Sequence, residues 1–374
     1  MGKKKILLLC QLPPPIHGQT LMNSYVVGSR VLSTKYDVEL LPIRFASSNA
    51  DVGRFSPRKV LKTVVLSLRL FIKLLTNKIA FIYFTIAPTG KAFLRDCLFV
   101  GIAKLLRKTV VFHLHGKGIR DNSNAPGFGA LYKWAFHRQY VIVLSEKLQH
   151  DVADLGLRRA PFVVPNGIPL LADDQEINSI FAERSEKTGP PTILFLSNMK
   201  ISKGVLDLLQ ACASLKNEGV EFRAVFRGAW SNDNCRSVFY DFISKNDLEN
   251  CVVYGGPAYG EEKVAAFGKA DMFVFPSRNE AFPLVLLEAM QFGLPVISTS
   301  IGGIEDIVLS GENGIIIQSG DVDQLKGAMT ELILDPQRRI TFGQKGRDKY
   351  LREFTIERFE ERLSKAFDEV SASL

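Results

Sequence analysis

The feature that most constrains the fold is a series of short apolar runs that lack polar alternation and are separated by helix-length segments. In the first half of the chain such runs lie at residues 6–10, 38–43, 79–86, 110–115, 141–144 and 162–164. Strands that are buried on both faces of a parallel sheet have this composition, and helices usually connect them. The alternation therefore predicts a doubly wound α/β domain.

The same alternation restarts after a polar segment that ends in Gly189-Pro190-Pro191. The second set of apolar runs lies at residues 193–197, 221–226, 252–254, 272–276, 295–299 and 314–317. A chain of 374 residues is long enough for two cores. Open α/β sheets bind ligands outside the carboxyl ends of their strands. We therefore predict two Rossmann-like doubly wound domains facing each other across a cleft.

The predicted domain boundaries follow these changes in composition along the chain. We expect a first domain over residues 1–170, a linker over 171–190, a second domain over 191–353, and a C-terminal helix over 354–374. The last helix is amphipathic, so we expect it to pack back toward the first domain.

Charge is divided unequally between the two halves. Residues 1–170 hold 25 Lys and Arg against 8 Asp and Glu, a balance of +17, and the remainder holds 22 against 31, a balance of −9. The basic half favours an anionic partner, such as a phospholipid surface, a phosphorylated acceptor or nucleic acid. Residues 58–78 and 91–108 combine apolar and basic side chains. Each segment fits either a helix that lies in a membrane interface or a core-facing helix with a solvated basic rim. The positive balance of the first half favours the first alternative, with an anionic membrane surface as the partner.

Other features of the composition exclude several classes of protein. The five cysteines are scattered and form no CxxC pair, which argues against a disulfide framework or a zinc site and fits a reducing cytosol. The apolar run at 6–10 is too short for a signal peptide, and no run approaches the roughly 18 residues of a membrane span. No metal-ligand cluster is visible, so we expect no essential metal and no cofactor. The chain is expected to be soluble or peripheral to a membrane.

The most informative segment joins the apolar run at 272–276 to a helix that begins near Pro283. The amides of Leu284 and Val285 would then project from a helix N-terminus, where a phosphate can bind. Glu288, about one turn further, could reach a ribose diol, and Glu280 on the preceding loop could receive a sugar hydroxyl. Two carboxylates on either side of one anion site suit a nucleotide-sugar. Alternatively, Glu280 caps the helix and Glu288 is a solvated helix residue.

This segment resembles the Glu-x7-Glu signature of glycosyltransferase family 4, a group of retaining GT-B enzymes. It reads Glu280-Ala-Phe-Pro-Leu-Val-Leu-Leu-Glu288-Ala and continues to Gly-Leu-Pro-Val-Ile, with Ala281 where glycine is usual. Further similar segments occur in the family's order along nearly the whole chain. They are Pro13-Pro-Pro-Ile-His-Gly18-Gln, Val111-Phe-His-Leu-His115-Gly, Val164-Pro-Asn-Gly-Ile168, and Ile301-Gly-Gly-Ile-Glu305 with Gly311-Glu-Asn-Gly314.

The resemblance implies a role for each matching residue. Lys203 and the amides of Leu284 and Val285 would stabilise the leaving diphosphate, Glu288 would hold the ribose, and Glu280 would contact the transferred sugar. It also implies that Phe282 contacts the donor, that Gly18 permits close backbone approach, and that His115 lies near the reacting centre. His115 could equally be a satisfied histidine at a strand end, and His113 would face the same side.

One position departs from the family pattern. Asn198 stands where the family usually has an arginine that binds the donor diphosphate, so either Lys200 or Arg227 replaces that arginine or phosphate binding is weaker. This departure motivates one alternative, a catalytically weakened partner subunit. A GT-B sugar-nucleotide epimerase is a second alternative. A dinucleotide-dependent oxidoreductase is excluded, because no GxGxxG follows the first apolar run.

Together these features predict a retaining, metal-independent glycosyltransferase that uses a UDP- or GDP-sugar. The expected acceptor is a glycan or a lipid-diphosphate-linked oligosaccharide, as in bacterial surface polysaccharide or lipopolysaccharide biosynthesis. The expected location is cytoplasmic, peripheral at the inner face of the membrane. Nucleic acid is not an expected partner, because aromatic residues are sparse among the basic ones.

Overall fold

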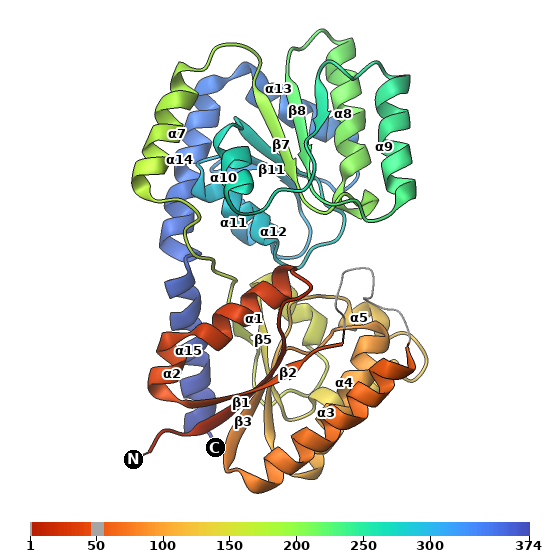
Figure 1. The fold of residues 1–374 in the computed structure, drawn as a ribbon, viewed down its shortest axis with the longest axis vertical. Helices are drawn as coiled ribbons and strands as arrows, with labels where there is room; N and C mark the ends of the chain where they lie inside the picture. Colours follow the sequence, from red (N-terminus) through yellow and green to blue (C-terminus); the bar gives the residue numbers. More distant parts are fainter. Residues whose placement is uncertain (1, 46–55) are drawn as a thin grey trace. The chain divides into compact units, whose positions relative to one another are not determined.

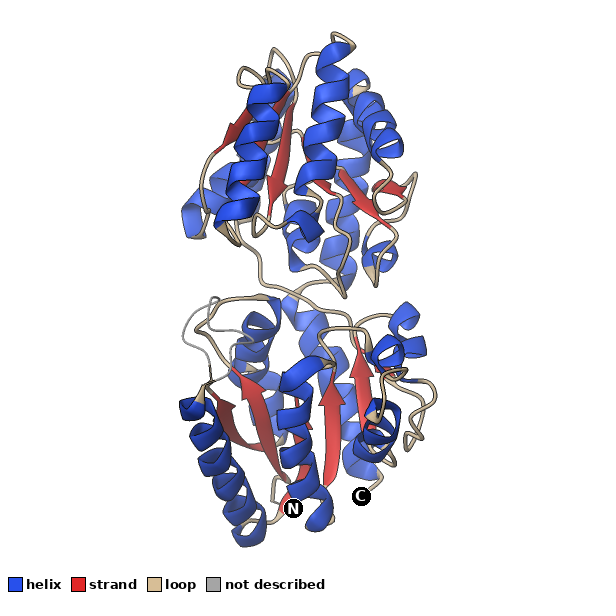
Figure 2. Cartoon of the chain, turned by 90° about the vertical axis from the view of Figure 1, so that its right-hand side faces the viewer, coloured by secondary structure: helices blue, strands red, loops and turns tan. Residues whose placement is uncertain are grey.

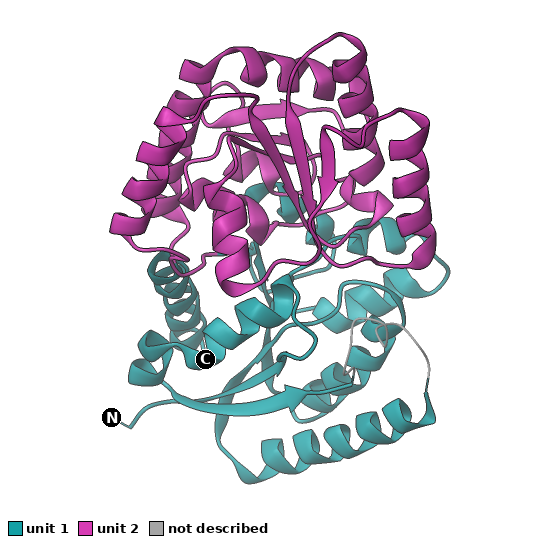
Figure 3. Cartoon of the chain, turned by 45° about the horizontal axis from the view of Figure 1, so that its top comes forward, with its two compact units in different colours: residues 1–166, 356–374 teal, residues 167–355 magenta. Residues whose placement is uncertain are grey.

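The computed structural model describes residues 2–45 and 56–374. These residues form two compact units, each with its own sheet (Figure 3). Unit 1 comprises Met1–Asn166 and Ile356–Leu374, and unit 2 comprises Gly167–Thr355.

Unit 1 is a six-stranded parallel sheet with helices on both of its faces (Figures 1 and 2). In spatial order the strands are β2 (Asp37–Ile43), β1 (Lys5–Gln11), β3 (Ile79–Phe84), β4 (Thr109–His113), β5 (Tyr140–Val143) and β6 (Phe162–Val163). The helices are α1 (Gly18–Gly28), α2 (Arg30–Lys35), α3 (Pro57–Thr76), α4 (Gly90–Leu105), α5 (Ile119–Asn122), α6 (Phe128–Phe136), the 3-10 helix η2 (Glu146–Val152) and α15 (Ile356–Ala372). The strand order reverses between β1 and β3, which is where such sheets bind ligands.

Unit 2 repeats this architecture. Its strands, in spatial order, are β12 (Gly314–Ile317), β11 (Val296–Thr299), β10 (Met272–Phe275), β7 (Thr192–Leu196), β8 (Arg223–Arg227) and β9 (Val252–Tyr254). The helices are α7 (Asp174–Glu186), the 3-10 helix η3 (Ile201–Lys203), α8 (Val205–Asn217), α9 (Asp233–Lys245), α10 (Gly260–Gly268), α11 (Leu284–Gln291), α12 (Ile304–Ile307), α13 (Val322–Leu334) and α14 (Pro336–Glu353). Here the order reverses between β7 and β10. The observed fold is thus the predicted pair of Rossmann-like doubly wound sheets.

The predicted linker and the predicted C-terminal helix both make tertiary contacts. Residues 171–190, expected as a linker, contain helix α7, whose Arg184 guanidinium donates to the carbonyls of Phe292 (2.9 Å) and Phe267 (3.4 Å). The C-terminal helix α15, expected to pack toward the first domain, belongs to unit 1, where the Phe367 ring meets the Phe81 ring edge-on at 5.2 Å. Both segments are fixed by contacts with residues distant in sequence, which a local pattern does not contain.

Helices α11 and α14 approach closely through two glycines. A Cβ atom on Gly343, in the middle of α14, would lie 1.9 Å from the carbonyl oxygen of Gly293, which follows α11 with φ of +57°. Only a residue without a side chain permits this approach. The helix that carries Glu288 is therefore held against α14 at backbone distance.

We expect Gly343→Ala to lower the free energy of unfolding by about 2–3 kcal/mol, because the added methyl group forces α14 away from Gly293. Gly327→Ala is the matched control, since that helical glycine has open space around it. It should be neutral or stabilise by up to about 1 kcal/mol. Urea unfolding of both variants measures the difference, and equal effects would contradict this account of the close approach.

Candidate functional site

The loops that follow β7 and β10 meet where the strand order of unit 2 reverses. Gly204, with φ of +82°, lies so close to the second loop that a Cβ atom would be 2.1 Å from the carbonyl oxygen of Pro276. The Arg278 amide donates to the carbonyl of Ser202 at 2.9 Å, and the Ser277 hydroxyl donates to the same carbonyl at 3.3 Å. A glycine at position 204 is therefore required by the backbone contact between the two loops.

Lys203 and Glu280 form an ion pair across this junction. The Lys203 Nζ atom lies 2.5 Å from Glu280 Oε1, and the Ser277 hydroxyl donates to the same oxygen at 3.1 Å. The side chains are 25% and 12% exposed, respectively, so the pair is accessible from one side only. A cation and a carboxylate placed together at a switch point can bind both an anion and a hydroxyl-bearing ligand.

The loop that carries Glu280 is fixed from two further directions. Gly302, with φ of +62°, sits where a Cβ atom would be 2.3 Å from the Glu280 carbonyl oxygen, and the Gly303 amide donates to the Ala281 carbonyl at 2.7 Å. The Arg278 guanidinium donates to both carboxylate oxygens of Asp207 at 2.6 and 2.9 Å. These hydrogen bonds to Asp207 raise the pKa of Arg278 above its ordinary value. The position of Glu280 is thus set by contacts with the segments around Asp207 and Gly302 as well as by its own loop.

Helix α11 begins at Leu284, with Pro283 as its extended N-cap residue. Leu284 and Val285 form the first turn and are half-buried. The first amides of an α-helix lack partners within the helix, so this turn can bind an anion. Pro283 therefore lies one position outside the helix, not within the first turn as the sequence predicted.

Glu288 is buried, which excludes the alternative of a solvated helix residue. Its carboxylate forms an ion pair with Lys263 of helix α10, and their side chains are 7% and 23% exposed. Lys263 was not identified from the sequence. It is one of many lysines in an ordinary helix, and its proximity to Glu288 arises only from tertiary packing.

The structure also shows where Asn198 and the two cations that could replace the usual arginine lie. Asn198 and Lys200 are exposed in the loop after β7. Arg227 ends β8 opposite Leu196 of β7, and its guanidinium donates to the Pro257 carbonyl at 3.1 Å and to Glu262 at 3.2 Å. Its Nε atom is buried without a hydrogen-bond partner among the described residues. Arg227 is therefore a cation held at the carboxyl end of β8, with a buried Nε–H group that has no partner among the described residues.

The side chain of Phe282 is buried and packs edge-on against Phe354 at 5.9 Å. Its position in the interior of unit 2 makes the ring a packing element of the loop that also carries Glu280. Gly18 and His115 belong to unit 1, and the other predicted site residues belong to unit 2.

In unit 1, three histidines gather at the carboxyl edge of the sheet. Strand β4 ends at His113, two residues earlier than the sequence predicted, and His115 lies in the following loop. The rings of His113 and His115 are 4.1 Å apart, and His113 Nδ1 is 2.7 Å from the Tyr83 hydroxyl. His17 precedes Gly18, the first residue of α1, and its amide donates to the Thr20 hydroxyl at 3.0 Å.

Burial controls the charge of these histidines. Burial, with a contribution from His17, lowers the pKa of His115 to about 3, and burial together with His115 lowers the pKa of His113 well below its ordinary value. Burial also lowers the pKa of His17. The Nε2 atoms of His113 and His115 are buried without a partner among the described residues. A neutral His115 can accept or donate one hydrogen bond but carries no charge at neutral pH.

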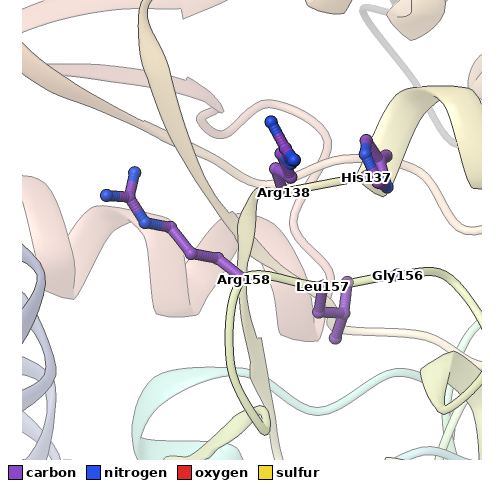
Figure 4. Close-up of a pocket in the computed structure, with 5 residues that line it drawn as sticks. All are labelled: His137, Arg138, Gly156, Leu157 and Arg158. Atoms are coloured by element: carbon purple, nitrogen blue, oxygen red, sulfur yellow. The ribbon is translucent and has the colours of Figure 1, made fainter.

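Unit 1 also has a surface pocket, lined by His137, Arg138, Gly156, Leu157 and Arg158 (Figure 4). The Arg138 amide donates to the Gly156 carbonyl at 2.8 Å, which joins the end of α6 to the segment before β6. None of the predicted site residues lines this pocket. Within residues 2–45 and 56–374, no three or more His, Cys, Asp or Glu side chains are arranged so that they could hold a metal ion.

Two Rossmann-like doubly wound sheets in one chain define a protein of the GT-B architecture. Solved structures with the same fold include sucrose-phosphate synthase from Thermosynechococcus elongatus, with TM-score 0.75, 17% identity and 100% of both chains covered. Anabaena HepE, solved in complex with UDP, has TM-score 0.76 and 19% identity over 98% of this chain and 100% of that chain.

The family model described as Glycosyl transferases group 1 matches residues 176–349, which lie in unit 2. A relative described as an uncharacterized glycosyltransferase, MJ1178 of Methanocaldococcus jannaschii, is 27% identical over 281 residues, covering 75% of this chain and 74% of that protein. The capsular polysaccharide biosynthesis glycosyltransferase CapM of Staphylococcus aureus is 24% identical over 236 residues, covering 61% of each. These matches support a place for the chain in the glycosyltransferase superfamily.

Lys263→Met should lower the free energy of unfolding by about 3 kcal/mol, because it leaves the buried Glu288 carboxylate without its partner. The double variant Lys263→Met/Glu288→Gln should recover most of that loss, since a neutral amide tolerates burial better than an unpaired charge. Guanidinium unfolding of the wild type and the variants measures both effects. If the double variant were as unstable as Lys263→Met, the ion pair would not be the source of the stability.

The histidines predict a pH dependence of stability. The folded-state pKa of His115 is about 3, and the unfolded value is about 6.5. The unfolded chain therefore binds more protons between these pH values, so stability is full above pH 6.5 and falls as the pH is lowered toward 3. His115→Gln should reduce this slope by up to about 1.4 kcal/mol per pH unit. Urea unfolding from pH 4.5 to 7.5 tests it, and the same slope in His115→Gln as in the wild type would contradict the prediction.

Proposed function

We propose that this protein is a glycosyltransferase that moves a sugar from a nucleotide-sugar to a hydroxyl group of an acceptor. The observation that carries the proposal is the Lys203–Glu280 pair at the switch point of unit 2, beside the first turn of α11. The donor is a UDP- or GDP-sugar, and the HepE complexes with UDP and UDP-glucose make UDP-sugars the first to test.

The proposed chemistry assigns leaving-group stabilisation to unit 2. Lys203 and the amides of Leu284 and Val285 bind the diphosphate, with Arg227 beside Asn198 as a further cation. The charge of Lys203 is balanced by Glu280 in their ion pair. Binding of the diphosphate to Lys203 would free the Glu280 carboxylate to accept a sugar hydroxyl. Glu288 would accept hydrogen bonds from the ribose diol, with Lys263 holding its carboxylate in place.

The transfer itself needs no covalent enzyme intermediate. The bond between the anomeric carbon and the phosphate oxygen breaks, and the acceptor oxygen bonds to the same face of that carbon, so configuration is retained. The proton of the acceptor hydroxyl passes to the leaving phosphate. His115 would act as a neutral hydrogen-bonding group in unit 1, and Gly18 would allow close backbone approach. We propose that the reaction requires no metal and no cofactor.

The proposed acceptor is a glycan or a lipid-diphosphate-linked oligosaccharide of a bacterial surface polysaccharide. The names of CapM and of the lipopolysaccharide outer core galactosyltransferase WaaB, a structure with TM-score 0.71 and 18% identity, support this class. The protein would work in the cytoplasm as a peripheral protein at the inner face of the membrane. No helix among the described residues is long and apolar enough to cross a bilayer.

Asn198 favours one second candidate, a weakened family member that acts as a partner subunit. Asparagine cannot bind a phosphate bidentately as arginine does. A sensitive assay of donor hydrolysis separates the two functions, because a partner subunit would bind or ignore the donor without releasing sugar.

Nucleotide-induced thermal stabilisation tests the donor site directly. A nucleotide or nucleotide-sugar at 100 times its Kd should add about 2.7 kcal/mol to the stability. We expect one nucleotide family to give this shift, and Glu288→Gln to lose it because an amide is a poorer acceptor for a ribose diol. Glu331→Gln, which removes a surface pair with Arg338 in unit 2, is the matched control and should retain the shift. The absence of a shift with every UDP and GDP compound would overturn the proposed function.

A further inference from the structure

Helix α3 of unit 1 has apolar residues on two opposite faces. One face is buried and consists of Thr63, Leu66, Leu70 and Leu74. The other face is exposed, with fractional exposure of 64% at Leu61, 58% at Leu68 and 58% at Leu75. Residues of the exposed face recur every three or four positions; the remaining members are Val64, Val65 and Ile72. A surface helix ordinarily has one apolar face, so this second face is unexplained by the core of unit 1.

Helix α4 extends the exposed face. It packs against α3 in unit 1 (Figure 1), and Leu94, Leu98 and Leu105 are 44%, 56% and 73% exposed. Trp134 of α6 is 43% exposed and lies beside Gly101 of α4. Tryptophan is favoured where apolar and polar surroundings meet at a bilayer surface. We call the exposed apolar residues of α3 and α4, with Trp134, the α3–α4 face.

The charged residues around the α3–α4 face are predominantly basic. Helix α3 contains Arg58, Lys59, Lys62, Arg69 and Lys73 and no acidic residue, and of these Lys73 is paired with Glu39 of β2. The one carboxylate of helix α4, Asp96, is buried and paired with Arg95. An apolar face flanked by lysine and arginine is the arrangement of helices that lie in the interface of an anionic bilayer. A second copy fits less well, because a symmetric pairing would bring the basic flanks together.

We propose that the α3–α4 face inserts into the surface of a bilayer rich in anionic lipid. The apolar side chains enter the boundary between headgroups and acyl chains, and the basic side chains contact lipid phosphates. The inference deepens the proposed function, because a lipid-linked acceptor must be met at a membrane. The biological purpose of membrane binding rests on the proposed function, whereas the binding itself requires no donor and no turnover.

Co-sedimentation of the full chain with lipid vesicles tests the proposal. Vesicles of phosphatidylcholine with 30% phosphatidylglycerol (about this fraction, to give an anionic surface) are compared with pure phosphatidylcholine. We expect binding to the anionic vesicles, weakened by raising the salt. The variant Leu61→Ser/Leu68→Ser/Leu75→Ser should lower the partition coefficient at least about tenfold, since each leucine loses its burial in the bilayer. Leu309→Ser/Leu334→Ser, at exposed leucines of unit 2, is the control and should bind as the wild type does.

Several outcomes would overturn the proposal. They are failure of the wild type to bind anionic vesicles, equal binding by the triple serine variant, and equal binding to vesicles without anionic lipid. A wild-type dimer in solution that the triple variant abolishes, without vesicle binding, would assign the face to a second copy instead. Nucleotide-induced stabilisation of the same variants separates the two proposals. Vesicle binding without any nucleotide shift would leave this inference standing while the proposed function failed.

Discussion

The contact between the loop after β7 and the loop after β10 is the constraint on which the rest of unit 2 depends. Gly204 lies against the Pro276 carbonyl on one side, and Gly302 lies against the Glu280 carbonyl on the other. Three backbone segments therefore meet with no side chain between them. Parallel sheets place loop ends together wherever the strand order reverses, and here the glycines bring these loops into direct contact. The positions of Lys203 and Glu280 follow from that contact.

Each carboxylate of the candidate site is paired with a lysine from a different element. Glu280 pairs with Lys203, and Glu288 pairs with Lys263. Such partly buried pairs contribute little net stability compared with apolar packing, but each is costly to break on one side. The Glu280 pair lies at the loop junction, and an anionic ligand can replace Glu280 as the partner of Lys203. The Glu288 pair holds a buried carboxylate of helix α11 against Lys263 of helix α10. The two pairs thus differ: Lys203 can exchange its carboxylate partner for an anionic ligand, whereas Lys263 keeps the Glu288 carboxylate in place.

The sequence predicted the class of fold because buried parallel strands leave a plain signal in short apolar runs. It also located the segment with Glu280 and Glu288, since a strand, a polar loop and a proline-initiated helix are all local features. It did not predict helix α7, because its composition is polar and its stability comes from Arg184 and other contacts with distant residues. Lys263 was missed for the same reason. The end of β4 at His113 depends on pairing with β5, which no local pattern contains.

The unequal charge of the two halves constrains how a nucleotide-sugar could bind. Residues 171–374 carry 22 Lys and Arg against 31 Asp and Glu, so the overall field of this region repels a diphosphate. Binding there must come from local groups that act at short range, such as Lys203, Arg227 and the first amides of α11. Residues 1–170 carry 25 against 8, and in α3 the basic groups lie along one side of an exposed apolar face. Long-range electrostatic attraction of anions therefore comes from residues 1–170, whereas specific short-range contacts with a diphosphate must come from residues 171–374. An anionic surface would be sensed by the first region, whereas an anionic small molecule must be recognised by the geometry of the second.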